Sequence, residues 1–159
     1  IDIHDEAGNY TEAVAWMNDN GFVATLLGPK PGSASSVKML RSTLVKGIEA
    51  LGVESLVSAQ RQGILDEVLG CLGDADSMGL SGFITMLVQT HVVHAHPRWE
   101  EMGLVAQTLR ETGVDPLMTE AIEKSHRRTV DAHIAPADGQ VPSLEDALKI
   151  LSEKVIRGR

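Results

Sequence analysis

Apolar side chains recur every three or four residues over most of this chain, which is the period of an amphipathic α-helix. The clearest case predicts a long helix over residues 33–61, with Ser33 or Ser35 as its cap. One face of this helix is formed by Val37, Leu40, Leu44, Ile48 and Leu51. Because further apolar residues cover much of the remaining circumference, we expect a buried central helix.

The same period predicts five more helices, over residues 63–72, 79–94, 97–112, 116–133 and 144–157. Their ends carry local signals. Ser143 and Asp146 resemble a capping box, and Asp115 followed by Pro116 is a helix start. Gly113 suits the end of the preceding helix. The chain is therefore predicted to be mainly α.

The N-terminal stretch follows a different pattern. A short helix ending near residue 19 leads into an Asn20-Gly21 turn, and residues 22–27 are short, apolar and partly β-branched, as in a buried strand. Residues 1–31 are thus expected to be the end of an α/β domain, and residues 32–159 a helical domain. A single strand makes no stable sheet, so its partners are expected in another chain or upstream.

Composition excludes several classes of protein. The 159 residues include 14 Lys+Arg and 22 Asp+Glu, a formal net charge of −8, and aromatic residues make up only 3%. This balance argues against binding to nucleic acid or to an anionic membrane surface. No apolar run is long enough to span a membrane. The single Cys71 fits a reducing compartment, so a cytoplasmic location is expected.

A candidate binding and catalytic site is found where the predicted strand leads through a Gly/Ser/Ala loop into the long helix. Small residues and a helix N-terminus favour a bound carboxylate or phosphate, although a tight turn into a buried helix is the simpler reading. Lys38 interrupts the apolar pattern about one turn into the helix, and Arg41 lies three residues further on. A nearby like charge and partial burial favour the neutral amine that acid–base chemistry requires. The alternative is a lysine that extends to solvent from a partly exposed face.

This segment, Gly32-Ser-Ala-Ser-Ser-Val-Lys38, resembles the catalytic segment of the β-hydroxyacid dehydrogenase superfamily, which includes 6-phosphogluconate dehydrogenases. The superfamily pattern is Gly-x-x-Gly-x-Gly-x-x-x-Lys-x-x-x-Asn. With Lys38 as its lysine, Gly32, Ala34 and Ser42 take the second Gly, third Gly and Asn positions. Lys46-Gly47 and the segment from Glu101 to Leu117 extend the likeness, which is greatest to the branch of phosphogluconate-dehydrogenase-like NAD-binding proteins of unassigned substrate.

The resemblance implies an all-helical C-terminal domain of the 6-phosphogluconate dehydrogenase type, carrying a short α/β stub. It implies Lys38 as the acid/base of an NAD(P)-dependent oxidoreductase, with Gly32, Ser33, Ala34 and Ser42 binding a small hydroxyacid-like substrate. Glu101 would contact the cofactor, and the helical domain would form a homodimer. NAD or NADP would be held mainly by a domain not present in this chain, because no Gly-x-Gly-x-x-Gly follows a strand here.

Some positions depart from the superfamily. Ser42 replaces an Asn, and a hydroxyl reaches less far than an amide. Glu100 stands where a second Lys is frequent, and Glu101 where Asp is frequent. These exchanges affect the cofactor contact and the binding of an anionic substrate. A second hypothesis therefore stays open, a non-catalytic all-helical module for dimerisation or interaction.

Histidines form the second candidate cluster. His91 and His94 would share one helix face, with His96 just beyond the helix end. A metal site needs three or four ligands, so we expect no metal and favour a role of these side chains in lining a cleft. His126 and His133 are expected at the surface.

Overall fold

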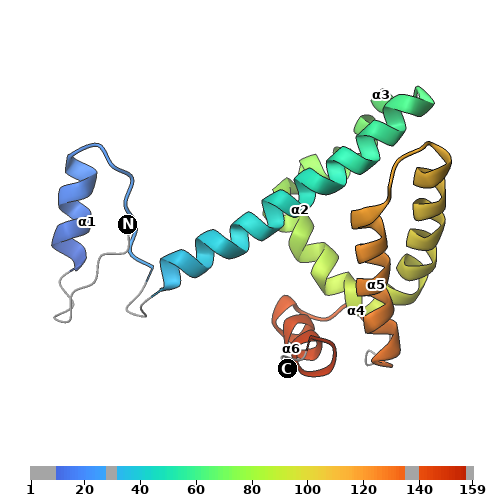
Figure 1. Ribbon diagram of the computed structural model, residues 1–159. Helices are drawn as coiled ribbons and strands as arrows, with labels where there is room; N and C mark the ends of the chain where they lie inside the picture. The colour runs from blue at the N-terminus through green and yellow to red at the C-terminus, as the bar shows by residue number, and fades with distance from the viewer. Residues whose placement is uncertain (1–9, 28–31, 135–139, 157–159) are drawn as a thin grey trace. The chain divides into compact units, whose positions relative to one another are not determined.

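The computed structural model of this protein describes residues 10–27, 32–134 and 140–156, and within these ranges it is all-helical (Figure 1). The helices are α1 (Tyr10–Asp19), α2 (Ser33–Gln62), α3 (Leu65–Gly70), α4 (Gly73–Glu111), α5 (Leu117–Asp131) and α6 (Leu144–Lys154). The predicted all-helical class is confirmed. None of the described helices is both long enough and apolar enough to cross a membrane.

The chain divides into two compact units, residues 1–49 and 50–159, and α2 contributes to both. The domain boundary expected near residue 31 stays a prediction. Part of the expected stub, residues 1–9 and 28–31, lies outside the described residues.

In the N-terminal unit, the strand expected over residues 22–27 is absent, so that prediction is wrong. A strand needs a neighbour for its backbone groups, and the described residues supply none. At Ala24 alone, the side chain of Asn18 provides hydrogen-bond partners for the backbone, as a neighbouring strand would. Its Oδ1 accepts from the N–H of Ala24 at 2.8 Å, and its Nδ2 donates to the carbonyl of Ala24 at 3.2 Å. Val23, the preceding residue, is fully exposed.

The long helix α2 occupies the range its apolar period predicts, but it is not buried as expected. Its apolar side chains between residues 33 and 49 are exposed, with Leu40 at 67%. The buried positions are Glu54, Ser58 and Ala59, all in the C-terminal unit. The apolar period therefore predicts the helix correctly, but the side chains that pack inside the described chain are small or polar.

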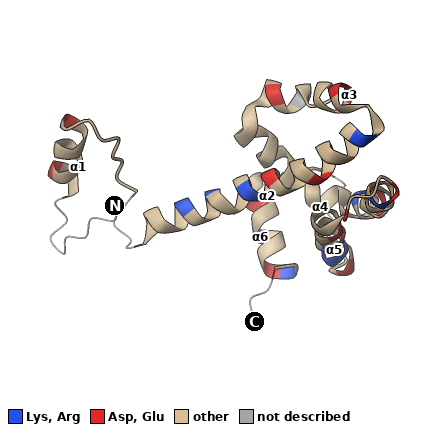
Figure 2. Cartoon of the chain, turned by 45° about the horizontal axis from the view of Figure 1, so that its top comes forward, with Lys and Arg blue, Asp and Glu red and all other residues tan. Residues whose placement is uncertain are grey.

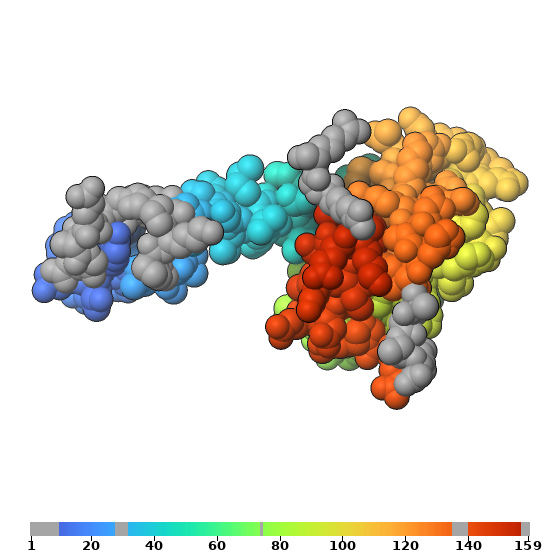
Figure 3. Space-filling view, turned by 90° about the horizontal axis from the view of Figure 1, so that it is seen from below, coloured from blue at the N-terminus to red at the C-terminus, as the bar shows by residue number. Residues whose placement is uncertain are grey.

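The C-terminal unit is built on α4, which packs against α5 and α6. Its long course is interrupted at Gly79, with φ +68°, and at His94, with φ −110° just before Pro97. These two breaks fall where the sequence predicts helix boundaries. Buried alanines, among them Ala95, Ala106 and Ala147, allow the helices to approach closely. Helix α6 lies foremost on this unit in the view of Figure 3.

Two predicted helix ends are confirmed. The hydroxyl of Ser143 accepts from the backbone N–H of Asp146 at 3.1 Å and donates to its carboxylate at 2.6 Å, which makes the N-terminal cap of α6. Gly113 follows α4 with φ +74°, a conformation that glycine adopts without strain.

Removing this cap tests its contribution. We expect Ser143→Ala to lower the free energy of unfolding by about 1 kcal/mol, because the first turn of α6 loses a side-chain acceptor. Urea denaturation followed by circular dichroism measures this change. The control is Ser152→Ala, the same substitution at an exposed interior position of α6, which is expected to be neutral or slightly stabilising. Equal effects of the two variants would contradict the capping role.

Candidate functional site

The C-terminal end of α2 presents one polar face to the connection between α4 and α5. Glu54, Ser58 and Arg61 recur at spacings of four and three residues, so they lie on the same side of the helix. Each makes a hydrogen bond to a residue between Thr112 and Thr119. We call this set the α2 bracket.

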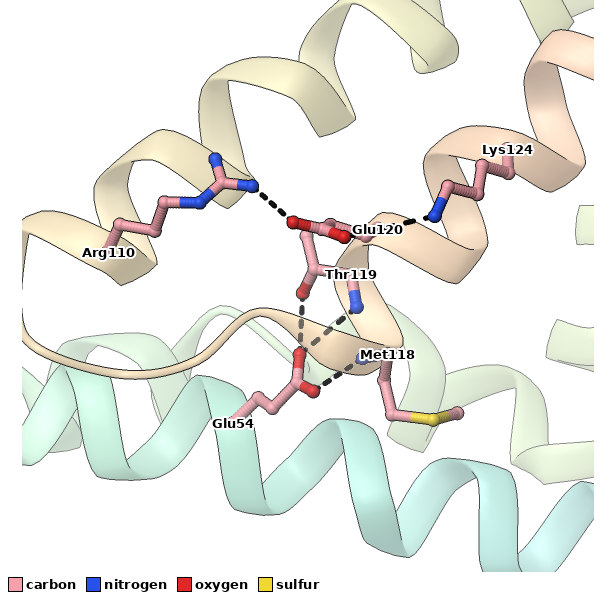
Figure 4. Close-up of polar contacts among 6 residues, drawn as sticks. All are labelled: Glu54, Arg110, Met118, Thr119, Glu120 and Lys124. Carbon is pink, nitrogen blue, oxygen red and sulfur yellow. Dashed lines mark hydrogen bonds and ion pairs between the residues drawn. The ribbon is translucent and has the colours of Figure 1, made fainter.

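Glu54 is the most buried charged member of the bracket, with 8% of its surface exposed. Its carboxylate accepts the backbone N–H groups of Met118 at 2.5 Å and Thr119 at 3.1 Å, and the hydroxyl of Thr119 at 2.8 Å (Figure 4). These N–H groups belong to the first turn of α5, whose own N-cap, Pro116, has no side chain that can accept them. A carboxylate from a distant helix therefore caps α5.

Two opposed effects act on this carboxyl. Burial raises the pKa of Glu54, whereas the hydrogen bonds from Met118 and Thr119 favour the ionised form and lower it. The net result is a pKa below the ordinary value. Glu54 is therefore a charged structural group at neutral pH.

The other two members of the bracket meet the C-terminal end of α4. Arg61 donates from Nη1 to the carbonyl of Thr112 at 2.8 Å. Ser58 and Thr112 share a hydrogen bond of 2.7 Å between their hydroxyls, and Thr112 also donates to the carbonyl of Leu109 at 2.8 Å. With its proton committed to Leu109, Thr112 accepts from Ser58.

A second contact holds the first turn of α5 on its opposite side. Glu120 receives a charge-assisted hydrogen bond from Arg110 of α4, and Lys124 lies 3.9 Å from its other oxygen (Figure 4). These side chains are one-third or more exposed, so the pairs contribute little to stability. The buried contact of Glu54 is the stronger constraint.

The residues predicted to bind and convert a substrate are at the start of α2, in the part of the helix that belongs to the N-terminal unit. Gly32 precedes the helix with φ +80°, and Ser33 and Ala34 open it. Lys38 is exposed and Ser42 is half-buried, one helical turn further along the same side. Figure 2 shows basic residues along this half of α2, where Lys38, Arg41 and Lys46 occur.

Glu101, predicted to contact a cofactor, is an exposed residue of α4 in the other unit. The residues at the start of α2 share one helix and its N-terminal boundary. The role of Glu101 stays a prediction.

The histidines are arranged differently from the prediction. His94 has left the helical conformation, so it does not share a regular face with His91. His91 instead stacks on His126 of α5, with ring centroids 4.8 Å apart, and its Nε2 lies 2.8 Å from the hydroxyl of Thr129. His126 is half-buried, which corrects its expected surface position. Among the described residues, no group of three potential ligands could hold a metal ion.

Both stacked rings favour their neutral forms. Burial lowers the pKa of His91 to about 4, with further contributions from the charges of His126, Arg98 and Arg128. Burial and Arg98 also lower the pKa of His126, which Glu101 partly offsets. His126 Nδ1 is buried without a hydrogen-bond partner.

An aromatic contact lies nearby on the same two helices. The guanidinium of Arg127 in α5 lies 4.5 Å from the ring centre of Trp99 in α4, a cation–π contact. His96 approaches the same indole edge-on, with ring centroids 5.7 Å apart. Trp99 of α4 therefore contacts α5, the helix that the stacked histidines also join to α4.

The comparisons with known proteins point to a family without an assigned function. Residues 59–129 match the family described as "Domain of unknown function (DUF1932)". Domains of this family are found C-terminal to NAD-binding domains of the 6-phosphogluconate dehydrogenase type. The match includes most of α4 and α5, with Arg61, Thr112 and both stacked histidines, but it excludes Lys38 and Glu54.

One curated relative is 28% identical over 98 residues, the "Uncharacterized 28.5 kDa protein in 7S RNA 5'region" of Methanothermus fervidus. The aligned part is 62% of this chain and 39% of the relative, so the chain spans about two fifths of that protein's length. No solved structure matches the chain significantly.

The capping role of Glu54 was missed at the sequence level. The available signal is a carboxylate on a long helix whose neighbours, Val53, Ser55 and Leu56, are uncharged. Asp115 is the local capping candidate, but the donors of Met118 and Thr119 are taken by Glu54. No local rule identifies a cap that lies 64 residues away.

Neutralising this carboxylate tests the cap. We expect Glu54→Gln to lower the free energy of unfolding at pH 7 by about 1–3 kcal/mol, because an amide cannot accept all three donors as well as a carboxylate does. The folded-state pKa of Glu54 is lowered, so its stabilisation is present above the ordinary pKa near 4.5 and is lost as the pH falls below it. The variant should therefore lose part of the acid sensitivity of stability between pH 5 and pH 3, measured by urea denaturation.

The matched control is Glu49→Gln, the same exchange at an exposed position of the same helix. It should leave stability within about 0.5 kcal/mol of the parent. A Glu54→Gln protein as stable as this control at pH 7 would rule out the proposed cap.

Proposed function

We propose that this chain is the C-terminal substrate-binding and dimerisation part of an NAD(P)-dependent oxidoreductase of the β-hydroxyacid type, with Lys38 as its acid/base. The observation that carries the proposal is the match of residues 59–129 to a domain family that follows NAD-binding domains. The chain joins that domain, through the continuous helix α2, to a segment with the residues of a substrate site.

The start of α2 supports substrate binding. Gly32 adopts a left-handed conformation in which a larger residue would be strained, and the small residues after it leave the backbone open to approach. The positive end of the α2 dipole favours the carboxylate of a hydroxyacid beside Ser33 and Ala34. A hydroxyacid bound in this way would extend its carbon chain toward the next turn of the helix.

Lys38 lies in that next turn, and Ser42 follows it at i+4. In the proposed reaction the neutral amine of Lys38 accepts the proton of the substrate hydroxyl as its carbon is oxidised, and in the reverse direction the ammonium donates it. The Ser42 hydroxyl donates a hydrogen bond to the same oxygen, the role an Asn would perform with longer reach. Lys38 is exposed in the described chain, so a substrate has access to its amine.

The hydride acceptor in this proposal is NAD or NADP, which supplies oxidising power when bound. The residues of this chain do not fit a complete dinucleotide site, because no glycine-rich fingerprint follows a strand. We therefore assign the cofactor mainly to a separate domain. Glu101 is proposed as a minor contact from the helical part, through hydroxyl rather than phosphate groups of the cofactor, because a carboxylate repels phosphate.

The same proposal includes a homodimer. The exposed apolar side chains of α2 include Val37, Leu40, Leu44 and Ile48, which recur every three or four residues and so lie on one face of the helix. An exposed stripe of this kind is typical of an interaction surface. This surface also supports the alternative function, a non-catalytic helical module for dimerisation or interaction, in which Lys38 has no chemical role.

Activity separates the two functions. The test uses the full-length protein with a panel of small 3-hydroxyacids and with NAD and NADP in turn. We expect Lys38→Ala to lower turnover by about a hundredfold or more, because an acid/base catalyst is removed. Lys46→Ala, two turns further along α2, is the control and should retain turnover. A full-length protein that is active and indifferent to Lys38→Ala would contradict the catalytic assignment and leave the alternative.

The dimer surface is tested separately. We expect Leu40→Glu to raise the dimer dissociation constant at least about tenfold, because an interface core does not accommodate an unpaired charge. Sedimentation equilibrium measures the change. Lys46→Glu introduces the same residue on the polar side of α2 and should leave the dimer intact. Dimers of unchanged strength in the Leu40→Glu protein would exclude this stripe as the interface.

A further inference from the structure

The stacked histidines, His91 of α4 and His126 of α5, are not used by the proposed function. They join two helices of the C-terminal unit by direct ring contact and by the hydrogen bond between His91 and Thr129. We call them the histidine pair. The contact lies in the second half of α5, two or more turns beyond the first turn that Glu54 caps.

The surroundings of the pair suit only uncharged rings. The ring centroids are 4.8 Å apart, so two imidazolium ions would repel each other strongly in this arrangement. The charged groups that face the pair are Arg98 and Glu101 from α4 and Arg128 from α5. Two cations against one carboxylate disfavour any added proton.

The hydrogen bonds of the pair also favour uncharged rings. His126 Nδ1 is buried and has no partner, so a proton placed there would be neither solvated nor shared. His91 Nε2 already has its contact with the Thr129 hydroxyl, which also lies 3.5 Å from the carbonyl of Ser125. The closed arrangement therefore has no acceptor for an additional proton on His126 Nδ1.

We propose that the histidine pair is a pH-sensitive switch that holds the second half of α5 against α4 at neutral pH and releases it on mild acidification. Opening exposes both imidazoles to water, where each can bind a proton. Glu54 keeps its charge over the same interval, so the first turn of α5 stays capped while its second half opens. The expected product is a locally opened unit, not an unfolded chain.

Proton linkage gives the direction in which pH shifts the opening equilibrium and the pH range over which it does so. An imidazole with its pKa near 6.5 when exposed and about 4 when closed takes up a proton on opening. The opening equilibrium therefore rises as the pH falls below 6.5 and levels off below about 4. Between pH 7 and pH 5, His91 alone raises the opening constant about twentyfold, and His126 adds to this.

Trp99 supplies a reporter, because its indole contacts Arg127 of α5. The chain has two tryptophans, and Trp16 lies in the N-terminal unit, so Trp16→Phe leaves Trp99 as the single fluorophore. His96 touches the same indole, so His96→Gln is included in the parent variant to remove its effect on the fluorescence. The parent should show increasing acrylamide quenching of Trp99 between pH 7 and pH 5.

The decisive variant adds His91→Gln and His126→Phe to that parent. Glutamine can keep a hydrogen bond to Thr129, and phenylalanine keeps a ring in the stack without a titrating nitrogen. The quenching transition should disappear in this variant. An unchanged transition in the variant, or no transition in the parent, would overturn the proposal.

A second measurement tests the proposal without substitutions, in case the variant does not fold. In the wild-type chain, histidine side chains labelled with ¹³C are titrated by NMR. The imidazole of His91 should remain neutral at pH 6, and it should take up a proton together with the appearance of fast amide exchange in residues 122–131. Ordinary titration of every imidazole, with unchanged exchange in α5, would also overturn the proposal.

Discussion

The buried carboxylate of Glu54 is the contact on which the C-terminal unit depends most. Helix α5 begins at Pro116, which offers no side-chain acceptor, so its first N–H groups need a partner from elsewhere. Glu54 provides it from α2, together with a bond to the Thr119 hydroxyl. A carboxylate buried to this degree is tolerated only with such donors, so the end of α2 and the start of α5 each require the other.

Much of the helical architecture was predictable because it depends on local signals. The apolar period gave the extent of α2, and Gly79, Pro97, Gly113 and Ser143 marked breaks, ends and caps through their own backbone or side-chain chemistry. The failures have a common cause. The strand at residues 22–27 requires a neighbouring strand, and the contacts of Glu54 and His126 join residues 35 or more positions apart. Local periodicity carries no information about such partners.

The candidate substrate site was also predictable only as far as local helical geometry determines it. The spacing of Lys38 and Ser42 predicts that both lie on one side of a helix, and that placement depends on helical geometry alone. The burial expected around them depends on whatever covers the first half of α2. The apolar side chains there are exposed in the described chain, so the expected burial around Lys38 is not supplied by the described residues.

The α2 bracket also matches the electrostatics of the two helices that it joins. Arg61 meets the carbonyl end of α4, where the helix dipole is negative, and Glu54 meets the N–H end of α5, where it is positive. The two side chains are seven residues apart, which is almost two full turns. Insertion of a single residue between them would turn one away from its target by about 100°. This part of α2 therefore tolerates exchange of many side chains but no change in length, and related chains that keep the bracket should show no insertions or deletions there.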